Sequence, residues 1–399
     1  EIMPSLVGSE MCIRDRVFID MMRTDLLSVY NQNVKDKTSF DLLLEKIGGC
    51  IYTNCYTPAP DTPRSLACLQ TGLHPYFNGC NTRIKWPKYY VKEEIDTIFD
   101  ILSNNKILIN YYAPKVDLDT GALSIKEGSV VNLFTNIEKF TSNILQSTCD
   151  EMDFLTLDDY HWAIDDYGAT HKAVKIGHNI ISNVLNTFFR THSYDEFDHI
   201  FFFSDHGHKL ENEIALMESA LELLRDDRAK ILMVHRSKRN SGLSIDNRLC
   251  SIQDLYATIL SIFHLNYDHR DSLSLLSTSK SDVHDHLIIE DHADFTVSLN
   301  QVISVWRYIS DAGSFYTNVC KYSKEGYCEL SNSTIISLIQ QKSPTYLDYE
   351  RQMLILKEYS KMSEKYCTYS NGGKRLGRKK QVLLKVKNKC YRFLIKCFR

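Results

Sequence analysis

The chain alternates between short apolar runs and longer segments with helical periodicity. Apolar runs of strand length end at Asp20, Leu157 and Phe203, and the run that ends at Phe203 is the most strongly apolar of them. A segment over 171–189 has apolar residues at every third or fourth position, which is typical of an amphipathic helix. Strands that alternate with helices in this way predict an α/β fold, with a mostly parallel central sheet and helices on both of its faces.

The pattern changes in the last third of the chain. Two short apolar runs, 287–290 and 302–308, indicate strands of a smaller sheet, and 346–361 has helical periodicity. We therefore predict a catalytic α/β domain over 17–265 and a small C-terminal α+β subdomain over 266–365.

The two ends of the chain stand apart from both domains. Residues 1–16 resemble translated sequencing-adapter sequence more than native protein, so we set them aside and expect the natural N-terminus to be missing. Residues 366–399 form a basic tail, in which 374–399 hold 11 Lys and Arg residues, interleaved with apolar ones, and no acidic residue. Such a tail fits peripheral contact with an anionic membrane surface, and it fits equally a solvated terminal helix.

Composition and charge narrow the class of protein. Of the 399 residues, 43% are hydrophobic and 24% are charged, as in ordinary globular proteins, and no uncharged apolar run reaches the about 18 residues of a membrane-spanning helix. The net charge of −3 hides an acidic body, and no motif for reading nucleic acid occurs, so we expect no nucleic-acid partner. The 12 cysteines are scattered without CxxC spacing, which favours reduced thiols and a cytoplasmic location.

Polar residues follow four of the predicted strands. In α/β folds the chemistry gathers at the carboxyl ends of the strands. Carboxylates, a hydroxyl and imidazoles that converge on one edge of a sheet are suitable ligands for a divalent cation. Each residue alone has a plain alternative, because a strand-end aspartate is often a helix N-cap and a threonine before proline is often a turn residue. The candidates at these four ends are Asp20, Thr62, His161, and the group Asp205, His206 and His208.

Taken in order, the motifs of this chain resemble those of the sulfatase branch of the alkaline phosphatase superfamily. The resemblance covers residues 17–310 and implies the fold of that superfamily, which is alkaline phosphatase-like. The matching segments are Asp20–Arg23, 38–43, 52–60, 69–75, 78–79, Ser204–Gly207, 228–232 and 251–260, with 271–276, 287–290 and 306–309 in the C-terminal subdomain.

Thr62 takes the place of the nucleophile in this family. In sulfatases that place holds a Cys or Ser that matures to formylglycine within a Cys/Ser-x-Pro-x-Arg signature, whereas this chain has the stretch Asp61-Thr62-Pro63-Arg64-Ser65. Threonine does not mature to formylglycine, because its β-carbon carries a methyl group. Residues 111–114 also differ from the Lys-x-x-His that sulfatases use for the sulfate oxygens. Both departures favour the phosphatases, phosphonate hydrolases and phosphotransferases of the superfamily; Ser65 is an alternative nucleophile.

The resemblance implies a metal-assisted mechanism. Asp20, Thr62, Asp205 and His206 would hold a divalent cation, and this mixed oxygen and imidazole set suits Mn²⁺ or Zn²⁺ better than Ca²⁺. The cation would make the Thr62 hydroxyl a stronger nucleophile toward the ester. His161 is the candidate for contacting the transferred group or protonating the leaving oxygen. The candidates for binding the substrate are Arg23, Arg64 and His208.

The main hypothesis is a metal-dependent hydrolase or transferase that acts on a phosphate ester through Thr62. Its substrate would be an anionic ester linked to a surface glycan or a lipid. The first alternative is a sulfuric ester hydrolase (a sulfatase) that uses an unmodified threonine, and the second is an inactive relative that binds an anionic glycan. Retention of Asp20, Thr62, Asp205 and His206 together favours an enzyme, because a dead site has no physical need for a complete set of ligands.

Overall fold

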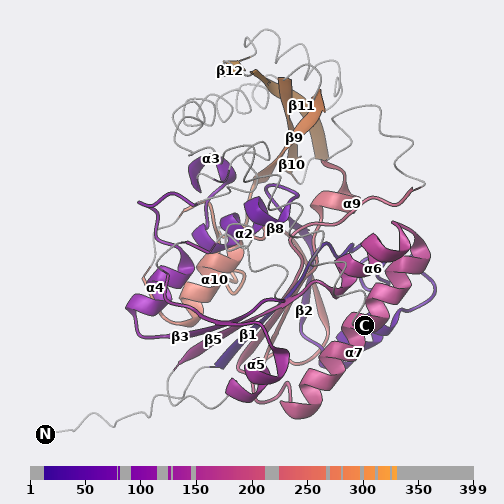
Figure 1. The fold of residues 1–399 in the computed structure, drawn as a ribbon, viewed down its shortest axis with the longest axis vertical. Coiled ribbons are helices and arrows are strands. Elements are labelled where there is room, and N and C mark those ends of the chain that lie inside the picture. Colours follow the sequence, from indigo (N-terminus) through magenta and orange to yellow (C-terminus); the bar gives the residue numbers. More distant parts are fainter. Residues whose placement is uncertain are drawn as a thin grey trace, which may run out of the picture.

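The structure of the chain is a computed structural model (Figure 1). It describes residues 13–78, 80, 91–114, 125–126, 129–144, 150–211, 224–266, 270–279, 282–296, 301–310, 313–323 and 326–329. The predicted helix at 346–361 and the predicted basic tail lie outside these residues.

An eight-stranded sheet forms the centre of the larger domain, with the strand order β4-β3-β5-β1-β6-β7-β2-β8. Every neighbouring pair is parallel except the two pairs of β7, which runs antiparallel to β6 and to β2. The prediction of a mostly parallel sheet is therefore confirmed. The strands are β1 Ile13–Ile19, β2 Cys50–Tyr56, β3 Leu108–Tyr112, β4 Asn132–Phe134, β5 Glu151–Leu157, β6 His199–Phe203, β7 Met233–Ser237 and β8 Ser244–Ser251.

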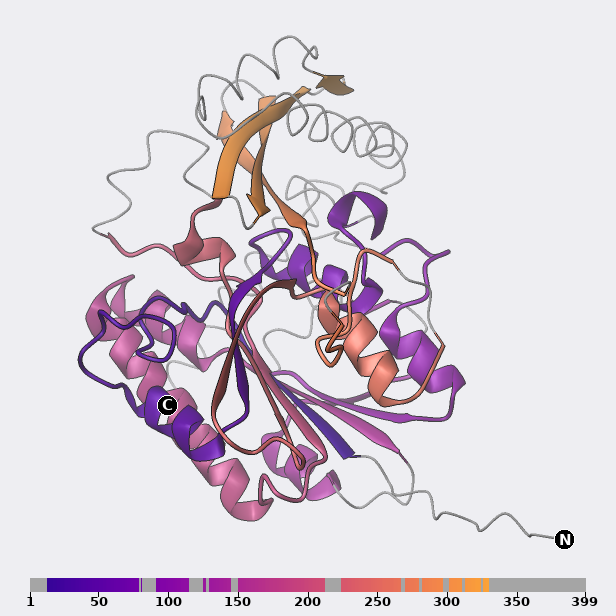
Figure 2. The ribbon, with the colours of Figure 1, turned by 180° about the vertical axis from the view of Figure 1, so that it is seen from behind.

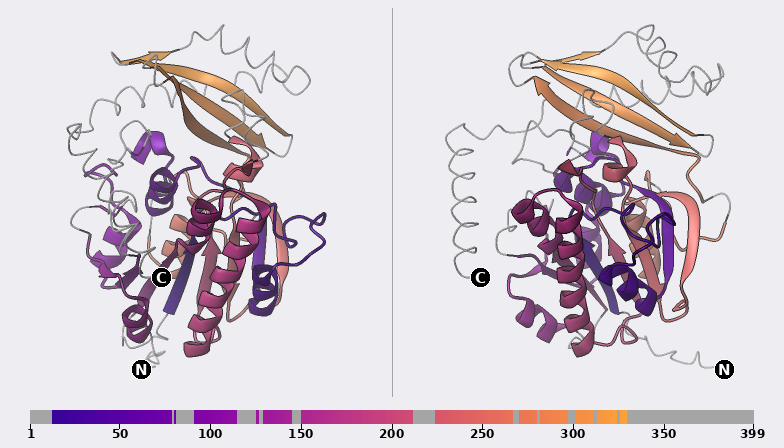
Figure 3. Two further views of the ribbon diagram at one scale, coloured as in Figure 1. Left: turned by 45° about the vertical axis from the view of Figure 1, so that its right-hand side comes forward. Right: turned by 90° about the vertical axis from the view of Figure 1, so that its right-hand side faces the viewer.

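Helices cover both faces of this sheet, as the sequence pattern predicts (Figures 1 and 3). Phe18 of β1 packs into the hydrophobic core on one face, and its neighbours Val17 and Ile19 pack into the core on the other face. The helices of the first core are α2 Thr62–Thr71, α4 Ile98–Asn104 and α10 Asp254–Ile262. Those of the second core are α1 Ser39–Ile47, α5 Ile137–Asn143, α6 Asp159–Tyr167 and α7 His171–Thr191.

Local sequence signals account for the starts of the helices. Thr38 and Asp41 form a capping box at the start of α1: the Thr38 hydroxyl accepts the backbone N–H of Asp41 at 3.1 Å, and an Asp41 carboxylate oxygen accepts the N–H of Thr38 at 2.8 Å. The side chain of Thr170 caps α7 in a similar way. Helix α2 begins at Thr62, one residue before a proline, and a proline is tolerated in the first turn of a helix.

A second, four-stranded antiparallel sheet has the order β12-β11-β10-β9 and stands over the edge of the large sheet where its parallel strands end (Figures 2 and 3). It confirms the strands predicted at 287–290 and 302–308. Between the two sheets lie the short helices α3 Pro75–Asn78 and α9 Asp226–Ala229 (Figure 1). The strands of the second sheet are β9 His286–Thr296, β10 Gln301–Ser310, β11 Gly313–Ser323 and β12 Gly326–Glu329.

Strand β1 begins at Ile13, inside the segment that we set aside. Residues 13–16 pair with β5, and residues 14–16 also pair with β6, so they extend the central strand of the sheet. That residues 1–16 are non-native stays a prediction. Among the described residues, no helix combines the length and the apolar character that a membrane span requires.

Candidate active site

Five of the residues predicted from the sequence meet where the parallel strands of the large sheet end. Asp20 follows β1, and Asp205 and His206 follow β6, which lies beside β1. His161 comes from α6, which follows β5 on the other side of β1. Thr62 is the first residue of α2, the helix after β2. The fold thus gathers a hydroxyl, two carboxylates and two imidazoles from four separate parts of the chain.

Asp20, Asp205 and His206 form a cluster of the metal-ligand type. One possible ligand atom from each of the three lies within 4.8 Å of the other two. The Oγ1 atom of Thr62 lies 3.4 Å from Oδ1 of Asp20 and 3.4 Å from Nε2 of His206. The threonine hydroxyl therefore borders the cluster on the side of two of its members.

The hydrogen bonds around Asp205 and His206 show that this cluster fits a cation. Oδ1 of Asp205 accepts the backbone N–H groups of Met21 and His206 at 3.1 and 2.8 Å, whereas Oδ2 is buried and has no hydrogen-bond partner among the described residues. Nδ1 of His206 lies 2.7 Å from the carbonyl oxygen of Gly207, which only accepts, so Nδ1 carries a proton, and in the neutral imidazole Nε2 carries the lone pair. That lone pair lies 3.3 Å from Oδ2 of Asp205. In that form two electron-rich atoms lie close together and repel each other, and a divalent cation between them would remove the repulsion.

The backbone at Met21 is strained in a way that serves the cluster. Met21 has a φ of 61°, in the left-handed region that residues other than glycine rarely adopt. In this conformation its N–H donates to Oδ1 of Asp205. Burial, opposed by His206 and aided by Asp20, raises the pKa of Asp205 to about 6, as expected for a carboxylate held in a dry place.

His161 forms a close ion pair with Asp20. Nδ1 of His161 lies 2.6 Å from Oδ2 of Asp20, and its Nε2 lies 3.7 Å from a carboxylate oxygen of Asp165. Burial disfavours the charged imidazole, but the Asp20 carboxylate outweighs burial and raises the pKa of His161 to about 9. Burial acts on Asp20 as well, yet the charge and hydrogen bond of His161 hold the pKa of Asp20 below its ordinary value. The pair is therefore an imidazolium beside a carboxylate at neutral pH.

The residues that flank Thr62 fix its backbone at the start of α2. Asp61 is the N-cap of this helix, and its Oδ1 accepts the backbone N–H of Arg64 at 3.3 Å. Pro63 stands in the first turn, where no helical acceptor waits for an N–H. The first N–H groups of a helix favour an anion, so the attacked group of an anionic ester would meet a favourable field beside Thr62.

Ser65, the alternative nucleophile, has its hydroxyl fully engaged. It is buried, donates to the carbonyl oxygen of Asp205 at 2.9 Å, and accepts the hydroxyl proton of Thr57 at 2.8 Å. Ser65 therefore supports the backbone of a metal-ligand candidate, and the geometry favours Thr62 over Ser65 as the nucleophile.

Arg23 and His208 lie beside the cluster and hold each other. The guanidinium of Arg23 donates to both carboxylate oxygens of Asp25, at 2.9 and 2.6 Å, and to the carbonyl oxygen of His208 at 3.2 Å. The imidazole of His208 accepts the hydroxyl proton of Tyr160 at 3.0 Å and donates from Nδ1 to the carbonyl oxygen of Lys209. Burial lowers the pKa of His208 to about 4, so this imidazole is neutral. Direct contact of either residue with substrate stays a prediction.

Arg64 is completely buried, and two carboxylates already contact its guanidinium. Its guanidinium is bonded to the carboxylate of Asp61 and lies 3.3 Å from the carboxylate of Glu290 on β9. In this structure Arg64 therefore supports the loop that carries Thr62, and its contact with a substrate oxygen also stays a prediction.

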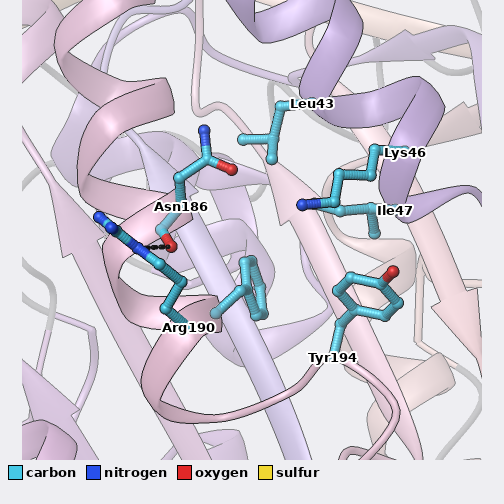
Figure 4. A pocket seen from close by; sticks show the side chains of 7 residues that line it. Leu43, Lys46, Ile47, Asn186, Arg190 and Tyr194 are labelled. Carbon is cyan, nitrogen blue, oxygen red and sulfur yellow. Dashed lines mark hydrogen bonds between the residues drawn. The ribbon is translucent and has the colours of Figure 1, made fainter.

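A pocket of about 270 Å³ lies between α1 and α7, at the opposite edge of the large sheet (Figure 4). Helix α1 ends at Ile47, shortly before β2 begins at Cys50, and Tyr194 precedes β6, so the pocket is next to the amino ends of these strands. It therefore takes no part in the cluster around Asp20. Its lining residues are Leu43, Lys46, Ile47, Asn186, Phe189, Arg190 and Tyr194.

Sequence reasoning missed three residues that shape the site: Met21, Asp61 and Glu290. Asp61 carries a signal, because an aspartate two residues before a proline is a frequent helix start. Met21 and Glu290 carry none. The left-handed backbone of Met21 follows from the cluster around it, and Glu290 reaches the site across 226 positions of sequence.

No protein-family model and no curated protein matches the sequence. Solved structures nevertheless match the fold. A 2-O GAG sulfatase has a TM-score of 0.62 at 12% sequence identity, with 91% of this chain and 93% of that chain covered. A protein solved in complex with its substrate D-glucosamine-2-N,6-O-disulfate has a TM-score of 0.61 at 10% identity, with 91% and 99% covered. The phosphonate monoester hydrolase of Silicibacter pomeroyi has a TM-score of 0.57 at 12% identity, with 87% and 95% covered.

These likenesses extend over nearly the full length of the chains compared, and they agree with the order of motifs along this sequence. At such low identity they bear on the fold alone. The chain has the sulfatase-like α/β fold of the alkaline phosphatase superfamily.

Proposed function

We propose that this chain is a metal-dependent hydrolase of anionic esters, with Thr62 as its nucleophile and a phosphate ester as its substrate. The observation that carries the proposal is the position of the Thr62 hydroxyl, 3.4 Å from both Asp20 Oδ1 and His206 Nε2. These two atoms belong to the same cluster as the buried Oδ2 of Asp205. A hydroxyl nucleophile is activated by an adjacent base or a bound metal, which these groups can provide. A threonine with only a structural role in a turn needs neither.

The cluster around Asp205 would hold the divalent cation, with Asp20 and His206 as the other protein ligands and Thr62 Oγ1 beside them. A cation bound there would polarise the Thr62 hydroxyl and neutralise charge on the attacked phosphoryl group. Mn²⁺ or Zn²⁺ suits a site of two carboxylates and one imidazole.

The residues of the site then divide the reaction between them. Thr62 Oγ1 attacks the phosphorus atom, so that an oxygen–phosphorus bond forms and the bond to the leaving alcohol breaks. The hydroxyl proton leaves toward Asp20 Oδ1, the oxygen to which the hydroxyl hydrogen-bonds. His161 holds a second proton at Nε2, because its Nδ1 is occupied by Asp20, and gives that proton to the leaving oxygen. Water then cleaves the threonyl-phosphate and releases orthophosphate; an acceptor alcohol in place of water would make the enzyme a transferase.

Sulfuric esters are the second candidate substrate. The observation that favours them is the likeness to a GAG sulfatase and to a protein solved with a disulfated glucosamine. The same likeness supports a glycan as the group that carries the ester. The unmodified threonine favours phosphate, because this chain lacks the Cys or Ser from which formylglycine is made.

The test is turnover of a panel of nitrophenyl esters with Mn²⁺ present, comparing phosphate, phosphodiester, phosphonate and sulfate. We expect turnover of the phosphate ester, and we expect Thr62→Ala to lower kcat by at least about 10³-fold. Ser65→Ala is the matched control, since it removes a hydroxyl three residues away, and it should stay within about tenfold of the parent.

Three other outcomes would change the proposal. Turnover of the sulfate ester alone would favour the second candidate. Loss of activity in Ser65→Ala but not in Thr62→Ala would assign the nucleophile to Ser65. Absence of turnover for every ester would favour an inactive relative that binds an anionic glycan.

A further inference from the structure

The first strand of the C-terminal sheet directly contacts the loop over residues 57–61, which leads into Thr62 and is called the Thr62 loop below. The backbone N–H of Glu290 on β9 donates to the carbonyl oxygen of Pro58 at 2.8 Å. Two residues earlier on the same strand, the carbonyl oxygen of Ile288 accepts a hydrogen bond from Nε2 of His74 at 3.2 Å. Pro58 lies in the loop before α2, and His74 lies just after α2. Strand β9 therefore touches the chain on both sides of the helix that Thr62 begins.

The side chain of Glu290 adds a charged contact to the two contacts that β9 makes with Pro58 and His74. It is fully buried, and its Oε1 lies 3.3 Å from the guanidinium of Arg64, which is fully buried as well. The other side of the same guanidinium is bonded to the carboxylate of Asp61. One arginine, two residues after Thr62, thus links the residue before Thr62 to the C-terminal sheet.

This arrangement couples the charge of Glu290 to the orientation of the nucleophile. Asp61 has two tasks: its Oδ1 caps α2 by accepting the N–H of Arg64, and its Oδ2 is bonded to the Arg64 guanidinium. A buried guanidinium is held in one place only while its partners are present, because a charge in a dry interior needs compensation. Glu290 supplies a partner from the C-terminal sheet, so it anchors Arg64, and Arg64 in turn fixes Asp61 next to Thr62.

We propose that Glu290 is a positioning residue for Thr62, so that the C-terminal sheet takes part in building the active site instead of merely covering it. The inference rests on the proposed function, in which Thr62 is the nucleophile. A shift of the nucleophile by about 1 Å from its reactive position lowers kcat steeply. Substrate binding through the metal cluster is affected less.

The test compares Glu290→Gln with Asp226→Asn. Asp226 is a control, because its carboxylate also pairs with an arginine between the two sheets, Arg307 at 2.5 Å. This pair joins β10 to α9, whereas the contacts of α9 with the chain before Thr62 are made by Ala229 and Arg228. We expect Glu290→Gln to lower kcat for the nitrophenyl ester by about 10- to 100-fold, with KM and Mn²⁺ affinity within about threefold of the parent. Asp226→Asn should keep kcat within about threefold. Equal kcat values for the two variants would overturn the proposal.

A double-mutant cycle distinguishes a role through Arg64 from a general loss of packing. In an Arg64→Met background, Glu290→Gln should lower kcat by no more than about threefold, because the group through which it acts is gone. A full further loss in that background would overturn the proposal.

Amide hydrogen exchange gives a readout that does not depend on turnover. Glu290→Gln should speed exchange at residues 57–66, and Asp226→Asn should leave exchange there unchanged. If the parent hydrolyses no ester but this difference in exchange is found, the positioning role stands and the proposed function fails. If the parent hydrolyses the ester and both variants exchange alike at 57–66, the proposed function stands and the positioning role fails.

Discussion

The Nδ1 atom of His161 lies 2.6 Å from Oδ2 of Asp20, whose other oxygen lies 3.4 Å from the hydroxyl of Thr62. One carboxylate thus joins the candidate proton donor to the candidate nucleophile. Because Nδ1 is occupied by this bond, only Nε2 of His161 is left to meet a leaving group, and about a third of the side chain is exposed (32%). The imidazole therefore has both an anchor and access to a substrate.

The first prediction concerns the leaving group. His161→Gln should lower kcat by about 10²- to 10⁴-fold for an alkyl phosphate, whose leaving oxygen needs a proton. For a nitrophenyl phosphate the loss should be much smaller, because nitrophenolate leaves without one. The measurement is kcat for both esters in both proteins. An equal loss with both esters would show that His161 acts on Asp20 or on substrate binding and not as the acid.

The second prediction concerns metal binding by Asp205. In the parent, Mn²⁺ should raise the melting temperature, because a ligand that binds only the folded state stabilises it. Asp205→Asn should abolish that rise, since the buried Oδ2 loses its charge. Without metal, the variant should be at least as stable as the parent, because it no longer buries a charged oxygen with no hydrogen-bond partner among the described residues.

The control for this measurement is Asp198→Asn. Asp198 pairs with Lys238 at 2.9 Å near the amino end of β6, far from the cluster, so the Mn²⁺ response should be retained. A normal Mn²⁺ response in Asp205→Asn would rule out the metal site as drawn here.

Much of the site could be predicted because an apolar run that ends in a carboxylate marks both a strand and its carboxyl end. The run before Asp205 is His199–Phe203, and it is β6 with the same bounds. Neighbouring parallel strands end at the same edge, so the strand ends that carry Asp20, His161 and Asp205 had to come close together.

The pairing of side chains could not be predicted in this way. From the sequence, Arg64 resembles a solvent-exposed arginine in the first turn of a helix. Only the folded chain shows that Glu290 pairs with it in the interior. The tautomer of His206 depends on the carbonyl oxygen of Gly207, which no sequence pattern reveals. The alternation of strands and helices also does not reveal that β7 runs antiparallel to both of its neighbours, β6 and β2.

The third prediction concerns Gly207, the glycine that follows the metal-ligand candidates Asp205 and His206. A Cβ atom on Gly207 would lie 2.1 Å from the carbonyl oxygen of Asp227 and 3.2 Å from Cγ of Arg23, so backbone would have to move. Gly207→Ala should lower the free energy of unfolding by about 1–3 kcal/mol in urea denaturation, as other overpacking changes do. It should also weaken Mn²⁺ binding, because His206 is the adjacent residue.

Gly242→Ala is the matched control for that change. A Cβ atom there meets nothing within 4 Å, so the free energy of unfolding should change by no more than about 0.5 kcal/mol. Similar losses in the two variants would mean that the close approach of Asp227 to Gly207 does not limit the residue at that position.

The fourth prediction concerns acid stability and His178 on α7. Its side chain is fully buried, stacks on the rings of Phe40 and Tyr160 at centroid distances of 6.1 and 5.5 Å, and has no hydrogen-bond partner for either nitrogen among the described residues. Burial lowers the pKa of His178 to about 4; Asp41 of α1, which faces it, opposes this shift, and His208 adds to it. The folded protein therefore keeps this imidazole neutral where the unfolded chain takes up a proton.

The sign of the pH effect follows from that difference in proton uptake. Between the ordinary histidine pKa of 6.5 and about 4, the unfolded state binds a proton that folded His178 does not, so stability falls as pH falls through this window. Phenylalanine fits between the same rings and binds no proton, so His178→Phe should lose less stability between about pH 7 and about pH 5, by up to about 1.4 kcal/mol per pH unit below the histidine pKa. Urea denaturation of both proteins at the two pH values measures this difference. The other buried histidines, such as His74, titrate alike in parent and variant, so an identical loss of stability in both proteins would show that His178 is not the group responsible.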